Sequence, residues 1–125
     1  MPSVTQKIKT SSGTTIHVVS ATAVGMLGHP RSPKWESVRL NHLKEFPCCA
    51  CCGRSIYLNV HHIKPFHEYP DLELSKTNLI TLCEYPSLNC HLFMGHLLNW
   101  KLANPRVRVD TNRYLAMLQK VKKKS

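Results

Sequence analysis

Four of the six cysteines fall in the short stretch CCACC, a clustering that is typical of a metal site. A zinc-binding turn presents two thiolates with two residues between them, and both Cys48 with Cys51 and Cys49 with Cys52 have that spacing. Gly53 follows Cys52 directly and favours the second pair, because glycine lets the backbone curl around an ion. A second pair of thiolates must come from later in the chain. The predicted ligands of a structural Zn²⁺ are Cys49, Cys52, Cys83 and Cys90.

The same cysteines allow two other interpretations. They could be buried thiols without an ion, since free cysteine is often buried. They could also form disulfides in a secreted protein. Their close spacing and the presence of eight histidines favour metal ligation in a reducing compartment. A structural ion would also contribute folding free energy to a domain this small.

Two adjacent histidines, His61 and His62, follow a strand-like run. On an extended backbone neighbouring side chains point to opposite faces, so the two rings suit two different tasks better than chelation of one ion. One ring can bind a catalytic metal while the other accepts a proton from water, since imidazole titrates near neutral pH. If this pair stood alone, a surface position without a role would be the favoured interpretation.

The surroundings of this pair resemble a known family. VHHIKPF, followed by NLITLC and then CH, is similar to the HNH endonucleases, the ββα-metal nucleases, over about residues 43–104. In that family a histidine or aspartate precedes the base histidine and a proline lies three residues after it, as in His61, His62 and Pro65. The CxxC motif and the later cysteines resemble the zinc-stabilised branch of the family.

The resemblance implies a role for each matching residue. His61 and His91 would bind the catalytic divalent ion, and His62 would be the general base. The side chain of Asn78 would fix the loop that carries His62. The implied reaction is hydrolysis of phosphodiester bonds in DNA by a one-metal mechanism, with Mg²⁺, Mn²⁺, Ni²⁺ or Zn²⁺ as the ion.

One position departs from the family pattern. Relatives with three-histidine sites place the third ligand four residues after the second, but that position is Gly95 here, and the candidate is His96, five residues after His91. On an α-helix a five-residue step rotates a side chain roughly 140° away from the first. His96 can therefore join the site only if His91 precedes the helix or if Gly95 permits a local bulge. Packing of His96 against Trp100, with water as the third ligand, is the alternative.

The expected elements indicate an α+β fold with flanking helices and a four-cysteine structural zinc site, and the family resemblance implies a small ββα-metal core. An amphipathic helix is expected to begin near Pro33 and to end at Pro47. Strands are expected over 56–60, running into the histidines, and over 78–83.

Helices are also expected after the second strand. One is predicted over 91–102, weakened by its central glycine, and a final short helix, capped by Asp110 or Thr111, runs through Leu118. The predicted organisation is an N-terminal arm or short strands over 1–30, an HNH nuclease domain over 31–105, and a C-terminal helix with a basic tail over 106–125.

The chain carries 17 Lys and Arg against 7 Asp and Glu, a formal charge of +10. Such a balance favours a polyanionic partner, nucleic acid before a membrane surface, and phosphate contacts would supply affinity but little sequence preference. No apolar run approaches the roughly 20 residues that cross a bilayer. The predicted DNA contacts are Arg31, Lys34, Arg39, Arg54, Lys64, Lys101, Arg106 and Arg108.

Two rival functions remain open at this point. A non-catalytic, zinc-stabilised nucleic-acid-binding module explains the cysteines and the charge but leaves the histidines and Asn78 unexplained. A secreted nuclease toxin shares the chemistry but conflicts with unpaired thiols, and the segment IHVVSATAVGML is too polar for a signal peptide. We therefore expect a cytoplasmic protein of a bacterial or phage-infected cell. A homodimer, a phage or defence partner protein, and the pathway of action are left open.

Overall fold

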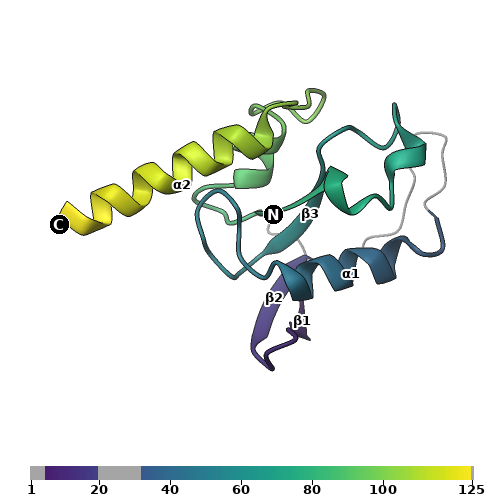
Figure 1. Ribbon diagram of the computed structural model, residues 1–125, viewed down its shortest axis with the longest axis horizontal. Coiled ribbons are helices and arrows are strands. Elements are labelled where there is room, and N and C mark those ends of the chain that lie inside the picture. The colour runs from purple at the N-terminus through teal and green to yellow at the C-terminus, as the bar shows by residue number, and fades with distance from the viewer. Residues whose placement is uncertain (1–4, 20–31, 125) are drawn as a thin grey trace.

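The computed structural model describes residues 5–19 and 32–124 (Figure 1). Four short strands form one sheet in the order β1-β2-β3-β4. The strands are β1 (Thr5–Lys9), β2 (Thr15–Val19), β3 (Leu58–His62) and β4 (Leu79–Cys83). β1 and β2 form an antiparallel hairpin, β3 and β4 form a second antiparallel pair, and one parallel pairing of Val18 with Leu58 joins the two.

The core lies between this sheet and the helix α1 (Trp35–Glu45). Leu43 of α1 is fully buried, as are Val18 and Leu58 on the two joined strands. Packing of apolar side chains from both elements supplies the main folding free energy of such a small domain. Figure 1 shows α1 close to the sheet, while the long helix α2 (Val107–Lys124) extends away from it to the C-terminus.

The pairing of β3 with β4 places the site. All five residues of β4 are buried, so this strand is covered on both faces, and the β3–β4 register places His61 opposite Ile80 and His62 opposite Leu79. A single π-helical turn, η3 (His91–Gly95), follows β4 and contacts both strands. This ββα arrangement confirms the predicted α+β fold class.

The structure corrects two predicted helices. The expected helix over 91–102 is only the five-residue turn η3, because Leu97 and Leu98 adopt left-handed backbone angles (φ 53° and 66°) that no α-helix accepts. The final helix is longer than predicted and begins at Val107, so Asp110 and Thr111 lie inside it rather than at its cap.

The strand before the histidines also begins later than predicted. The expected strand over 56–60 is replaced by β3 from Leu58, because Tyr57 has a φ of 55° and interrupts the extended backbone. The shorter helices η1 (Pro70–Leu72) and η2 (Lys76–Asn78) lie in the connection between β3 and β4. In the described part of the chain no helix combines the length and the apolar character needed to cross a membrane.

Candidate active site and metal centres

Four cysteines from three segments meet in one cluster that can hold a metal ion. Their four sulfur atoms all lie within 4.8 Å of one another, and the sulfurs of Cys52 and Cys83 are 3.6 Å apart. Three of the four side chains are buried and Cys52 is half-buried. The members are Cys49, Cys52, Cys83 and Cys90, the set predicted from the sequence.

The CxxC turn has the backbone geometry that such a site requires. Gly53 has a φ of 82°, a left-handed conformation that favours glycine, and its N–H donates to the Cys49 carbonyl at 2.9 Å. The N–H of Cys83 donates to the sulfur of Cys49 at 3.4 Å and so connects the turn to the end of β4. The Ala50 N–H donates to the carbonyl of Thr81 at 2.9 Å and ties the turn to β4.

Hydrogen bonds among the four thiols shift their pKa values in opposite directions. Hydrogen bonding with Cys49 lowers the pKa of Cys52 to about 6 and also lowers the pKa of Cys83. The same contacts raise the pKa of Cys49 and of Cys90. Because a thiolate is the form that binds metal, the lowered pair gives the cluster a starting anionic character at neutral pH.

The two remaining cysteines of the CCACC stretch lie outside this cluster. Cys48 is exposed, with its sulfur 3.4 Å from Ser55 Oγ. Cys51 is fully buried beside Cys90. Of the two pairs that the spacing allowed, the structure brings together the pair that precedes the glycine.

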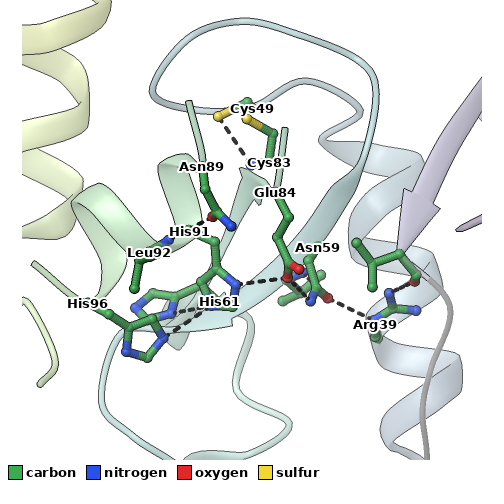
Figure 2. Close-up of polar contacts among 12 residues, drawn as sticks. Arg39, Cys49, Asn59, His61, Cys83, Glu84, Asn89, His91, Leu92 and His96 are labelled. Carbon is green, nitrogen blue, oxygen red and sulfur yellow. Dashed lines mark hydrogen bonds and ion pairs between the residues drawn. The ribbon is translucent and has the colours of Figure 1, made fainter. Parts of the chain in front are cut away.

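Three histidines form a second cluster that can hold a metal ion (Figure 2). His61 comes from β3, His91 opens η3 and His96 directly follows η3. His91 Nε2 lies 3.1 Å from His61 Nδ1 and 3.2 Å from His96 Nε2. Figure 2 shows the three rings converging on one point.

The outward hydrogen bonds of two rings determine which nitrogens face this point. His91 Nδ1 donates to Glu84 Oε2 at 3.1 Å, and His96 Nδ1 donates to the Leu102 carbonyl at 2.7 Å. In a neutral imidazole the second nitrogen then carries a lone pair. The two Nε2 atoms lie 3.2 Å apart on the inner side of the cluster, close enough to bind one cation together. This donor set fits a divalent metal ion.

His61 completes the donor set from the interior. It is buried, and within the part of the chain that the structure describes its Nε2 has no hydrogen-bond partner. Burial, together with the nearby His91 and His96 rings, lowers the pKa of His61 to about 2, and burial also lowers the pKa of His96. Both rings are therefore neutral at pH 7 and available as ligands.

The π-helical turn explains how His96 reaches the cluster across a five-residue step. A π-turn accommodates one more residue than an α-turn, so side chains five apart come to the same side. The bulge that Gly95 was expected to permit is therefore present. His96 also packs against Trp100, with the ring centroids 4.8 Å apart, so the aromatic contact accompanies its place in the cluster.

Gly95 is required by a close approach rather than by its backbone angles. A Cβ added there would lie 3.1 Å from Cε1 and Nδ1 of His61 and 3.2 Å from its Nε2. These distances are shorter than ordinary van der Waals contacts, so the His61 ring would have to shift. The glycine that departs from the family pattern thus makes room for the first histidine of the cluster.

We predict that Gly95→Ala weakens binding of a divalent ion at the histidine cluster by about 10-fold, because overpacking displaces a ligand ring. Calorimetric titration with Mn²⁺ or Ni²⁺ measures the change, and the metal content of the cysteine cluster is the internal control. Unchanged affinity in a folded variant would contradict the close approach as the reason for the glycine.

Glu84 is a site residue that the sequence analysis missed. Its Oε2 accepts the hydrogen bond from His91 Nδ1 and a second one from Asn59 Nδ2 at 2.8 Å (Figure 2). A carboxylate behind a ligand histidine fixes the tautomer and strengthens the ligand. The only signal in the sequence was a carboxylate directly after Cys83.

We predict that Glu84→Ala lowers the affinity of the histidine cluster for Mn²⁺ by about 10–100-fold, the usual cost of losing such a partner. Glu84→Gln retains an acceptor oxygen and should lose less. Glu68→Ala, which removes an exposed carboxylate lining the same cleft, is the matched control and should leave the affinity unchanged. Equal affinities for all three variants would contradict the assignment.

His62 is not a member of the three-histidine cluster. Its Nε2 donates to the carbonyl of Glu73 at 2.9 Å, so in the neutral ring Nδ1 is the basic nitrogen. The ring packs against Trp35, with centroids 4.5 Å apart. Backbone and aromatic contacts therefore hold both the tautomer and the orientation of His62.

Asn78 clamps the backbone that follows His62. Its Oδ1 accepts from the Lys64 N–H at 2.8 Å, and its Nδ2 donates to the Lys64 carbonyl at 3.1 Å. The Asn78 carbonyl also accepts from the N–H of Ile63 at 2.8 Å. These three hydrogen bonds tie Asn78 to the backbone of residues 63 and 64.

The three-histidine cluster and His62 line one cleft of about 950 Å³. His61, His91 and His96 contribute to its wall, as does His62. Of the predicted DNA contacts, Lys64 and Lys101 also line it, and both are exposed. The cleft thus combines three histidines that can hold a metal ion, a further imidazole and cationic side chains.

Of the other predicted DNA contacts, Arg39 also lines the cleft, and four more lie outside it. Lys34, Arg54, Arg106 and Arg108 are exposed outside the cleft, and Arg108 also donates to the carbonyls of Thr77 and Leu79. Arg31 lies outside the described residues.

Arg39 requires a correction, because it is buried rather than exposed. Its guanidinium donates to Asn59 Oδ1 at 3.2 Å, to Glu36 Oε1 at 3.0 Å and to the Val19 carbonyl. Those partners occupy the guanidinium, so Arg39 supports Asn59 and, through it, Glu84 (Figure 2), instead of reaching a phosphate.

Comparison with known proteins gives one match. Residues 49–92 match the family model described as HNH endonuclease, which confirms the resemblance inferred from the motifs. The matched segment begins at the first predicted zinc ligand and ends directly after His91, so it contains both strands of the ββ pair. The match indicates a nuclease or nucleic-acid-binding role. No curated protein and no solved structure matches the chain.

Proposed function

We propose that the protein is a metal-dependent DNA endonuclease that hydrolyses phosphodiester bonds with one catalytic ion, held by His61, His91 and His96. The observation that carries the proposal is the close approach of three imidazole rings, with His91 Nε2 3.1 Å from His61 Nδ1 and 3.2 Å from His96 Nε2, beside His62 in one cleft. The match to the HNH family supports the same conclusion.

The residues of the chain divide the chemistry between them. When bound, the divalent ion supplies Lewis-acid stabilisation of negative charge on the phosphoryl oxygens. His62 accepts the proton of the attacking water at Nδ1, while its Nε2–H stays bonded to the Glu73 carbonyl. Asn78 holds the loop that follows His62, so that the basic nitrogen stays aimed into the cleft.

The cysteine cluster has a separate, structural role in this proposal. Four thiolates in a closed set suit Zn²⁺, which accepts four sulfur ligands in a tetrahedron and leaves no open position for chemistry. Because the cluster joins the CxxC turn to the end of β4, the ion fixes the strand pair that carries the histidines. We assign the nuclease domain to 31–105.

The substrate contacts follow from charge. We propose that exposed cations, two of them lining the cleft, bind the phosphates of DNA with little preference for sequence. We place the protein in the cytoplasm of a bacterial or phage-infected cell, because cysteine ligands must stay reduced and the cytoplasm is a reducing compartment. The proposed contacts are Lys34, Arg54, Lys64, Lys101, Arg106 and Arg108.

A plasmid relaxation assay with and without Mg²⁺, Mn²⁺, Ni²⁺ or Zn²⁺ tests the proposal. Conversion of supercoiled plasmid to nicked or linear DNA only when a divalent ion is present would support it, and the product separates single-strand nicking from double-strand cleavage. Binding of the plasmid without cleavage under every ion would instead indicate the non-catalytic nucleic-acid-binding module.

A further inference from the structure

We propose that the 97–102 loop beside the histidine cluster is an apolar wedge that contacts the bases of duplex DNA. The inference goes beyond the proposed hydrolysis of phosphodiesters and rests on it only in taking DNA as the ligand. Four apolar side chains of this loop are exposed to solvent. They are Leu97 (49%), Leu98 (69%), Trp100 (53%) and Leu102 (48%).

The backbone of this loop is strained. Among the described residues only three non-glycine residues have positive φ, and two of them are the consecutive Leu97 and Leu98. A left-handed backbone is unfavourable for a residue with a bulky side chain, and such strain clusters at ligand-contacting sites. In this conformation a large part of both leucine side chains stays exposed to solvent.

Hydrogen bonds hold the loop in this conformation. The Leu98 N–H donates to the Leu92 carbonyl at 2.9 Å, and the N–H of Leu102 donates to the Asn99 carbonyl at 2.8 Å. The Leu102 carbonyl accepts the proton of His96 Nδ1 at 2.7 Å, so the loop is tied directly to a member of the metal cluster. An apolar surface that is exposed and preorganised binds a partner at low cost in conformational entropy.

The position of the loop indicates what it meets. The ring of Trp100 packs against two rings of the histidine cluster, with centroid distances of 5.1 Å to His91 and 4.8 Å to His96. Trp100 and Leu102 also line the cleft. A phosphodiester placed at the cluster would bring the neighbouring bases of the duplex against this loop.

The charge around the loop fits a polyanion. Residues 97–109 contain Lys101, Arg106 and Arg108 but no acidic residue. Apolar side chains flanked by cations are the combination with which proteins enter a groove, unstack a base step and hold the backbone on either side.

The test replaces both leucines in one variant, Leu97→Asn with Leu98→Asn. Asparagine tolerates the left-handed backbone, so the variant removes the apolar surface without adding strain. The matched control is Met117→Gln with Val121→Gln, which removes two comparably exposed apolar side chains (53% and 60%) from α2. Both sets are made in the His62→Ala background, so that bound DNA stays intact.

The readouts are duplex affinity over a salt series and the fluorescence of 2-aminopurine substituted at alternate adenines, which rises on unstacking. We expect the loop variant to weaken binding about 10-fold with an unchanged slope of log affinity against log salt, because it removes apolar contacts and no charge. The rise in fluorescence seen with the parent should disappear. Lys101→Ala should instead reduce the slope by about 1, and the α2 control should change neither quantity.

Three outcomes would overturn the wedge. They are unchanged affinity and fluorescence in the loop variant, an equal loss in the α2 control, and a shift from dimer to monomer in sedimentation, which would assign the loop to contact with a second copy. The experiment tests the wedge separately from the proposed hydrolysis. Loop-dependent unstacking by a parent protein that does not cleave would support the wedge and reject the nuclease, and cleavage without loop dependence would do the reverse.

Discussion

Replacing His62 with alanine is expected to lower the rate of DNA cleavage by about 10²–10⁴-fold, the usual cost of losing a general base. His62 is not a member of the three-histidine cluster, so affinity for Mn²⁺ or Ni²⁺ should stay close to that of the parent. DNA binding should also survive, because His62 is buried and carries none of the exposed positive charge.

The neighbouring histidines should fail differently. His61→Ala and His91→Ala each remove a member of the three-histidine cluster, so both should weaken metal binding itself, and excess ion should restore part of the activity. Asn78→Ala should behave as a milder His62→Ala, since it loosens the loop without removing the base. His67→Ala is the matched control, because His67 is an exposed histidine lining the same cleft and should be dispensable.

Calorimetric titration beside a single-turnover cleavage assay separates these effects. Loss of metal by His62→Ala, with retention by His61→Ala, would invert the two assigned roles. If neither change affects cleavage in a protein that cleaves DNA, the active site lies elsewhere. All variants should keep the metal bound to the cysteines, since that cluster shares no ligand with the histidines.

The second large effect is expected at the cysteine cluster, where Cys83→Ser or Cys52→Ser should leave the chain largely unfolded. Structural Zn²⁺ contributes about 10–16 kcal/mol in small zinc domains, which equals or exceeds the ~5–15 kcal/mol net stability of a typical domain. Serine is a poor replacement because its hydroxyl is not ionised at neutral pH. Cys83 also ends β4, so losing the ion releases the strand that pairs with both histidines of β3.

Far-UV circular dichroism and metal analysis of the purified variants measure this effect. The parent should carry about one Zn²⁺ per chain at the cysteines, and a folded parent without zinc would contradict the assignment. Cys48→Ser is the matched control, because Cys48 is exposed, lies in the same CCACC stretch and belongs to neither cluster. It should retain both zinc and the fold.

Features that depend on neighbouring residues could be predicted from the sequence alone. The CxxC pair followed by Gly53 defines one tight turn, because the turn needs only local backbone angles. The opposite orientation of His61 and His62 follows from the two-residue period of a strand. The strand pair and α1 followed from short apolar patterns, with an error of two residues at the start of β3.

Features that depend on distant residues were decided only by the tertiary structure. Glu84 joins the site because the β3–β4 pairing places it beside Asn59 and His91, a register that composition does not encode. Arg39 became a buried support for the same reason, since its partners lie on three separate elements.

The segment after His91 shows the same limit most clearly. Its apolar periodicity predicts a helix, yet the chain forms one π-turn and a strained loop. Local propensity is worth a few tenths of a kcal/mol per residue, whereas packing of the His61 ring on Gly95 and the bond from His96 to Leu102 act together across the fold. The tertiary contacts therefore override the local preference, and they bring His96 to the cluster.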